Sequence, residues 1–159
     1  MENSLSVFEQ IARRAYLYTT GKRESERVLH PFDERNIHQK LPAKVRNLFD
    51  DSHYGEATFM AFKFVDKEIQ RLSGANESGF KLMMNALNDS SPLVQLTPCR
   101  TTTEKDEQKG FMFLFAGSVL AIRNPRGHEV DVGDSPDRCL DHLSLASLLL
   151  RRLDEVPKS

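Results

Sequence analysis

The sequence has few of the features that mark secreted, metal-binding or disulfide-stabilised proteins. Only two cysteines occur in 159 residues, Cys99 and Cys139, and they lie far apart with no CxxC spacing. A disulfide framework or a zinc site is therefore not expected. Residues 1–6 are polar and acidic, and they lack the basic start and apolar run of a signal peptide. We expect a cytoplasmic protein.

The chain also lacks a long hydrophobic run and an excess of charge of one sign. Its most apolar stretch, 111–122, would rise only about 18 Å as a helix, well short of the roughly 30 Å bilayer core, so no membrane span is expected. The formal net charge is -1, which argues against a uniformly basic surface that grips long nucleic acid. A local basic site is compatible with this balance, because steering depends on how charges are distributed.

What the sequence does contain is the pattern of one soluble helical domain. Hydrophobic residues make up 39% and charged residues 28%, an ordinary globular balance. Apolar residues recur every three or four positions, and no β-type alternation of any length occurs. The predicted fold is an all-α bundle of four to five main helices, with 1–38 as an N-terminal helix and connector and 39–156 as the helical domain. The expected helices cover 5–18, 43–49, 54–72, 78–87, 110–122 and 135–153.

Two further predictions concern the helix over 110–122. Thr101–Glu104 could cap it, or 98–106 could be a mobile loop. Asn124-Pro125 is expected to end it, because proline disfavours a helical conformation in the residue before it. Since this helix is apolar on all sides, we expect it at the centre of the bundle.

A short polar segment follows this helix directly and holds the candidate site. It carries two arginines, an asparagine, a histidine and a glutamate: Arg123, Asn124, Arg126, His128 and Glu129. These residue types suit metal-free RNA cleavage, in which the ribose 2′-hydroxyl attacks the adjacent phosphate. A histidine can act as base or acid near neutral pH, and an arginine offers a fork of donors that matches phosphate oxygens. No metal-binding cluster of carboxylates occurs at helical spacing, so no metal or cofactor is expected.

Each candidate also has a plainer structural explanation. Arg123 could be a cation that stabilises the carboxyl end of a helix through the helix dipole and has no other role. His128 could be an ordinary surface histidine. Asn124 could be a helix cap and nothing more. The proposed substrate-binding residues are Arg126, Glu129 and His53. For Arg126 a solvated loop charge is the main alternative, for Glu129 an ion pair with an arginine, and for His53 a role at the start of the helix over 54–72.

A single histidine supplies half of what two proton transfers need. A two-fold dimer with this segment at its axis would bring two copies of Arg123 and His128 face to face. Surplus apolar faces on the helix over 54–72 and on the last helix are consistent with such a partner.

The spacing of Arg123 and His128, with Asn124 directly after the arginine, fits the R-x4-6-H signature of the HEPN superfamily. The wider pattern resembles its Ymh-type branch over roughly 41–153, through segments 48–54, 57–69, 110–117, 122–129 and 143–153. The resemblance implies a dimeric HEPN-like bundle that cleaves RNA at a composite cleft, leaves a 2′,3′-cyclic phosphate, and serves in antiphage defence or as a toxin. By this resemblance Arg123 and His128 are catalytic, Asn124 is the family's polar position, and an antitoxin or defence-system protein is a partner.

Two other functions fit the same sequence. The protein could be a non-catalytic RNA- or nucleotide-binding or interaction subunit of a defence system, whose polar segment binds phosphate without turnover. It could also be a plain helical oligomerisation domain. The near-neutral charge leaves both alternatives open.

Overall fold

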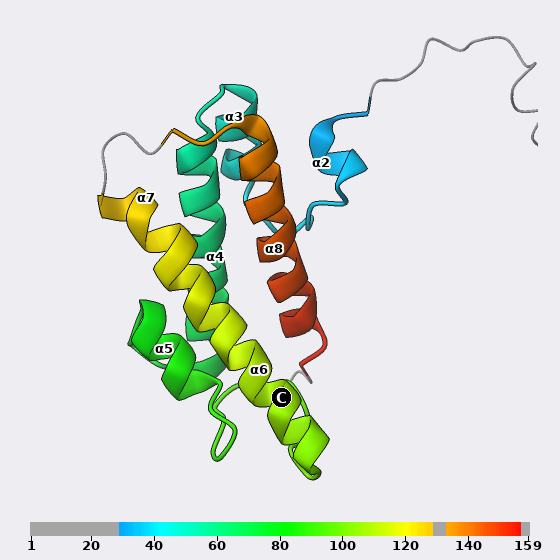
Figure 1. Cartoon of the computed structure of the whole chain (residues 1–159), viewed down its shortest axis with the longest axis vertical. Coiled ribbons are helices and arrows are strands. Elements are labelled where there is room, and N and C mark those ends of the chain that lie inside the picture. The colour runs from blue at the N-terminus through cyan, green and yellow to red at the C-terminus, as the bar shows by residue number, and fades with distance from the viewer. Residues whose placement is uncertain (1–28, 129–132, 157–159) are drawn as a thin grey trace, which may run out of the picture. The chain divides into compact units, whose positions relative to one another are not determined.

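The computed structural model describes residues 29–128 and 133–156, and within these ranges every regular element is helical (Figure 1). The chain divides after His30, earlier than the boundary expected from the sequence, and Pro31–Ser159 forms one compact unit. The predicted all-α bundle is confirmed for this unit. The helix expected over 5–18 lies outside the described residues. No helix in the described ranges has the length and apolar content needed to cross a membrane.

The helices of the compact unit follow one another with short connections. They are α2 (Pro31–Glu34), α3 (Ala43–Asp50), α4 (Tyr54–Ser73), α5 (Gly79–Ala86), α6 (Thr102–Ser118), the π-helical turn η1 (Val119–Arg123), α7 (Asn124–His128) and α8 (Pro136–Asp154). Helix α4 is the centre of the packing, since α3, α5, η1, α7 and α8 all contact it. Figure 1 shows α6, η1 and α7 as one rod that crosses the α4–α8 pair.

The sequence of α4 explains its central place. Ala57, Ala61, Val65 and Ile69 are at most 1% exposed, and their spacing of four residues puts them on one face of the helix. The helix ends as predicted at Gly74, whose φ of 67° is a left-handed conformation that glycine adopts without a steric penalty. Of the extra apolar positions of α4, Met60 and Phe64 pack against the core of the same chain, whereas Phe59 is half-buried and outside this core cluster.

Helix α6 begins eight residues before the predicted start at Gly110 because a capping box is present. The Glu104 amide donates to the Thr101 hydroxyl over 3.2 Å, and the Thr101 amide donates to the Glu104 carboxylate over 3.2 Å. Two amides that would otherwise lack partners at a helix start are thus satisfied. The capping prediction is confirmed.

The prediction that Asn124-Pro125 ends this helix is wrong. A proline inside a helix lacks an amide hydrogen and crowds the carbonyl of the preceding turn. Here the Asn124 amide donates to the Val119 carbonyl, five residues back, in the wider π-helical turn η1. This turn stands directly before Pro125, so the backbone is already opened where the ring needs room. The helix therefore continues to His128.

The prediction that α6 lies at the centre of the bundle is also wrong. One side of α6 is buried through Met112, Phe115 and Ala116. Its other side faces outward, with Phe113 54% and Leu114 48% exposed. An apolar outer face explains why the sequence resembles a fully buried helix.

Candidate active site

The polar segment lies on a continuous helical rod and not in a turn. Arg123 is the last residue of η1, Asn124 the first of α7, and His128 the last of α7. The three predicted catalytic residues thus lie on one continuous helical element, on which Arg123 contacts Asn124 through a bond from Nη1 to Oδ1, and a joint role with His128 stays a prediction. Such a scaffold holds side chains more firmly than a loop does.

The guanidinium of Arg123 is partly buried between α4 and the start of α5. Its Nη1 donates to Asn124 Oδ1 over 3.3 Å, and its Cζ lies 5.9 Å from the centroid of the Phe59 ring. A Cβ on Gly79 would lie 3.5 Å from Nη1. The Nε atom is buried and has no hydrogen-bond partner among the described residues. Since buried donors are normally satisfied, Arg123 is not fully satisfied by the described part of the chain.

Phe59 and Lys63 are neighbours of this site. From the sequence, Phe59 is expected only as an apolar position of α4, and Lys63 on its solvated face, from which it could reach the cleft. A Cβ on Gly127 would lie only 2.9 Å from Phe59 Cε2, so α7 can approach the ring this closely only with glycine at that position. Lys63 Nζ lies 5.9 Å from the same ring centroid. The spacing of Phe59 and Lys63 puts them on one helix face, but only the fold shows that this face meets Arg123.

The side chain of Arg126 is buried, so the alternative of a solvated loop charge is wrong, and its predicted role in substrate binding stays a prediction. Its Nε and Nη2 donate to the two carboxylate oxygens of Asp134 over 2.6 Å each, with the two side chains 3% and 0% exposed. Its Nη1 donates to the Ile122 carbonyl over 2.7 Å. With its guanidinium engaged in this way, Arg126 connects α7 to the residues that precede α8.

Burial and charge shift the pKa values around this ion pair. Burial raises the pKa of Asp134, but the hydrogen bonds and charge of Arg126 outweigh it, and the pKa lies below its ordinary value. Burial and the charge of Arg126 lower the pKa of His142. Arg126 Nη2 lies 3.4 Å from His142 Nδ1, and since a guanidinium only donates, Nδ1 is the acceptor. No pattern in the sequence links Asp134 or His142 to the polar segment, because neither is periodic with it.

The remaining predicted site residues are placed differently. His128 is exposed, and its side chain has no hydrogen bond or ion pair within 29–128 and 133–156. His53 lies at the start of α4, where its Nδ1 is 2.8 Å from Glu56 Oε2; no contact in the described part of the chain joins it to Arg123 or His128. Glu129 lies outside the described residues, and its role stays a prediction.

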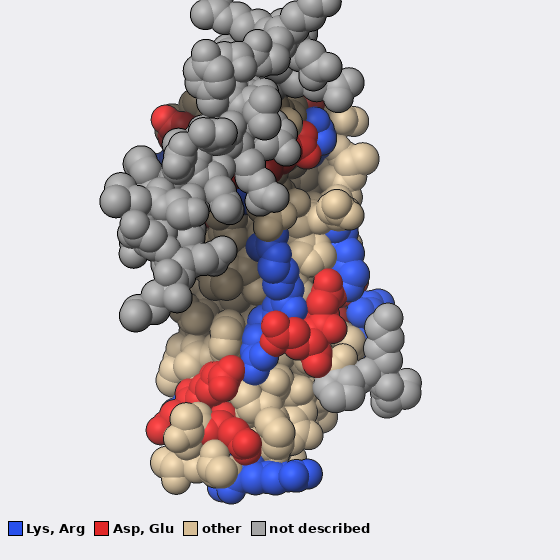
Figure 2. All heavy atoms as spheres, turned by 90° about the vertical axis from the view of Figure 1, so that its right-hand side faces the viewer, with Lys and Arg blue, Asp and Glu red and all other residues tan. Residues whose placement is uncertain are grey.

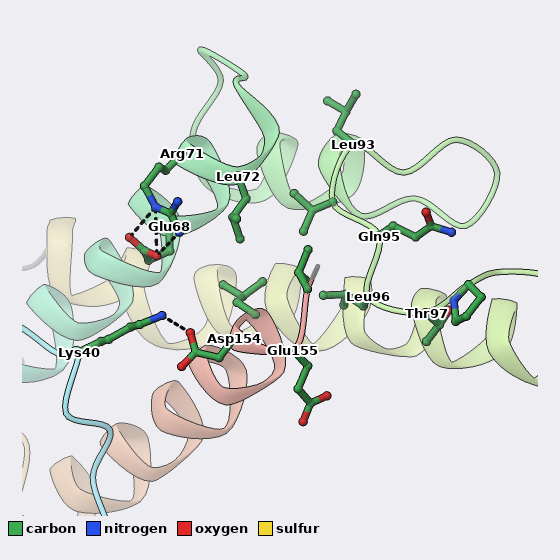
Figure 3. A pocket seen from close by; sticks show the side chains of 14 residues that line it. Lys40, Glu68, Arg71, Leu72, Leu93, Gln95, Leu96, Thr97, Asp154 and Glu155 are labelled. Carbon is green, nitrogen blue, oxygen red and sulfur yellow. Dashed lines mark hydrogen bonds and ion pairs between the residues drawn. The ribbon is translucent and has the colours of Figure 1, made fainter. Parts of the chain in front are cut away.

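A large hollow of the compact unit lies elsewhere. It measures about 1000 Å³ and is lined by the ends of α4 and α8 and by residues 93–98. Figure 3 shows that its charges pair with one another, Lys40 with Asp154 and Arg71 with Glu68. No described residue of η1 or α7 lines it. The hollow therefore adds nothing to the Arg123–His128 site.

Charges on the described surface are mixed in sign. Figure 2 shows Lys and Arg side chains directly beside Asp and Glu on one face. Ion pairs between distant segments include Arg35 with Asp141 at 3.0 Å and Arg152 with Glu107 at 2.7 Å. This face offers no continuous basic surface for a nucleic acid. Among the described residues, no group of His, Cys, Asp and Glu side chains could hold a metal ion.

Comparison with known proteins gives one match. Residues 35–153 match the model of a family described as "Protein of unknown function (Hypoth_ymh)". No curated protein and no solved structure matches the chain. The matched range covers most of the chain, from α3 to the end of α8, and includes the whole Arg123–His128 segment. The chain therefore belongs to the Hypoth_ymh family.

Proposed function

We propose that this protein is a metal-independent endoribonuclease of the HEPN type, with an active site completed by a second copy of the chain. The observation that supports the proposal is that Arg123 is partly buried and has few polar partners. Its guanidinium is partly buried, its Nε lacks a partner among the described residues, and its only polar partner there is the Asn124 amide. A buried cation without a carboxylate favours an anionic ligand such as a phosphodiester.

The chemistry needs one base, one acid and a donor for the phosphoryl oxygens. His128 of one copy removes the proton from the ribose 2′-hydroxyl, and the oxygen attacks the adjacent phosphorus. The second copy's histidine protonates the 5′-oxygen as its bond to phosphorus breaks, which leaves a 2′,3′-cyclic phosphate. Arg123 stabilises the charge that develops on the phosphoryl oxygens. Asn124 orients the guanidinium through the hydrogen bond to Nη1.

The outer face of α6 and η1 supports the second copy. This face is apolar over Phe113, Leu114, Gly117, Leu120 and Ala121, all of them exposed. Its small residues allow close approach of another helix. The same rod leads directly into the exposed Pro125 and His128. A two-fold axis through this face near α7 would bring the two sites together, since a two-fold interface uses the same surface of both copies.

The resemblance to the HEPN superfamily also suggests the biological role that we propose. A role in antiphage defence or as a toxin, with an antitoxin or another defence-system protein as partner, belongs to it. A non-catalytic RNA-binding subunit is the competing function, because one chain contributes a single histidine to the described site.

The first prediction tests the enzyme directly. Purified protein should cleave single-stranded RNA in the presence of EDTA and leave 2′,3′-cyclic phosphate ends. His128→Ala and Arg123→Ala should each lower the cleavage rate by about 100-fold or more, since each removes a proton carrier or an oxyanion donor. Cleavage is measured on a labelled oligoribonucleotide, with unfolding temperature as a check of the fold.

Arg100→Ala serves as the matched control, because its side chain is exposed and does not contact Arg123 in the described structure. His53→Ala is a separate test of the predicted role of His53 in substrate binding. RNA binding without cleavage by the wild type, under all conditions tried, would refute the enzyme and favour the binding subunit.

A further inference from the structure

Two cations lie near one partly exposed aromatic ring at the edge of the Arg123 site. Phe59 and Lys63 are one helical turn apart on α4. Lys63 Nζ and Arg123 Cζ each lie 5.9 Å from the centroid of the Phe59 ring. Phe59 is half-buried and Lys63 is exposed. Most other apolar positions of α4 serve the core, whereas this ring reaches the surface beside the proposed reaction site.

The backbone of α7 and the Arg123 side chain restrict the position of the ring. The Gly127 backbone lies against it so closely that a Cβ there would be 2.9 Å from Phe59 Cε2. Arg123 lies against the same ring and is itself fixed by Asn124. A ring positioned before the ligand arrives loses little conformational freedom on binding. The part of the ring that is exposed is thus a fixed platform.

The two cations beside the ring lack carboxylate partners in the described part of the chain. Elsewhere on the same helix and on the next one, Arg71 pairs with Glu68 at 2.9 Å and Lys81 with Glu77 at 3.0 Å. Lys63 has no ion pair within 29–128 and 133–156, and Arg123 has only the Asn124 amide oxygen. An aromatic ring beside two cations without carboxylate partners suits a ligand that carries both an aromatic ring and a negative charge.

An unpaired nucleotide is such a ligand. Base–aromatic stacking is tolerant of sequence, a lysine binds phosphate as a point charge, and a base can reach a side-chain ring only where it is not paired in a duplex. We propose that Phe59 and Lys63 form a subsite for one nucleotide of single-stranded RNA next to the scissile phosphate. Phe59 stacks on the base and Lys63 binds its phosphate. The inference rests on the proposed function for the position of the scissile bond. Binding of a nucleotide to the subsite can still be measured separately from cleavage.

The test uses an oligouridine in which every 2′-hydroxyl is methylated, so that 2′-attack cannot cleave it. Binding to the full chain is measured by fluorescence anisotropy over a range of salt concentrations. Phe59→Leu should weaken binding by about 5-fold or more through lost stacking and leave the salt dependence unchanged. Lys63→Gln should weaken binding at low salt and lower the slope of log K against log salt by about 0.7, the value for one phosphate contact on a single strand.

Two matched variants control for general effects on α4. Phe64→Leu removes a partly buried ring on the same helix, and Lys67→Gln removes an exposed lysine that bonds to Gln70 over 2.9 Å. Both should bind the oligonucleotide like the wild type. Because Lys63 is exposed, its variant remains informative even if Phe59→Leu proves unstable.

The outcomes separate this inference from the proposed function. The predicted binding losses in a protein that never cleaves natural RNA would support the subsite and refute the ribonuclease. Cleavage by the wild type, with unchanged binding and unchanged kcat/KM in both Phe59→Leu and Lys63→Gln, would overturn the subsite alone. No binding of the oligouridine by the wild type, or equal losses in the two control variants, would also overturn it.

Discussion

Asp134 and Arg126 form the most completely buried ion pair of the described structure, with side chains 0% and 3% exposed. Removing one partner of such a pair leaves the other charge buried without compensation. We predict that Asp134→Asn lowers the free energy of unfolding by about 3–5 kcal/mol, measured by urea denaturation. Asp137→Asn makes the same charge change at an exposed position in the first turn of α8 and should cost at most about 1 kcal/mol.

The pH dependence of stability gives this prediction a second measurement. The pKa of Asp134 is lower in the folded protein than its ordinary value, since Arg126 outweighs the effect of burial. The carboxylate therefore contributes stability above the unfolded pKa of about 3.9, and this contribution is lost as the pH falls through the lower folded pKa. The wild type should lose stability relative to Asp134→Asn in this range. A constant difference between the two proteins from pH 7 to pH 2 would contradict the assignment.

At the scale of elements, the rod of α6, η1 and α7 determines where the site residues stand. Its start is fixed by the Thr101–Glu104 capping box. Its middle is tied to the preceding loop by the buried Gln108, whose Oε1 accepts from the Leu96 amide over 2.8 Å and whose Nε2 donates to the Leu87 carbonyl over 3.0 Å. A rod anchored at its start and middle presents Arg123 and His128 at a fixed place.

The capping box can be tested by removing one hydroxyl. We predict that Thr101→Ala lowers the free energy of unfolding by about 1 kcal/mol, because the Glu104 amide loses its acceptor. Thr103→Ala removes an exposed hydroxyl in the first turn of the same helix. The control should change stability by a few tenths of a kcal/mol at most. Equal losses in the two variants would show that the cap contributes nothing specific.

At the scale of the whole molecule, the exposed apolar face of α6 and η1 predicts self-association. Leu114→Glu and Leu120→Glu place a charge on residues that are 48% and 50% exposed. In sedimentation velocity we expect a dimer for the wild type and a monomer for both variants, because burying a carboxylate in an apolar interface is costly. They should also lose RNA cleavage, although Arg123 and His128 are intact.

Leu93→Glu is the control for added charge, since Leu93 is 58% exposed and lies outside α6 and η1. Its oligomeric state and activity should equal those of the wild type. A wild-type protein that stays monomeric at high micromolar concentration would contradict both the interface and the composite site.

The sequence alone determined the helical class, the extent of α4 with its glycine stop, and the nearness of Arg123, Asn124 and His128. These features are local, since apolar spacing, caps and neighbours in the chain are all read within a few residues. It also indicated the Thr101 cap, but it could not choose between a cap and a loop.

Only the tertiary structure decided how the polar segment is held. Whether Pro125 ends a helix depends on the hydrogen bond from the Asn124 amide to the Val119 carbonyl, five residues back. The spacing of apolar residues does not reveal such a turn. The burial of Arg126 depends on Asp134, and the contact of Arg123 with Phe59 joins two helices far apart in the chain. Packing selects these partners from many equivalent residues, so no local pattern identifies them.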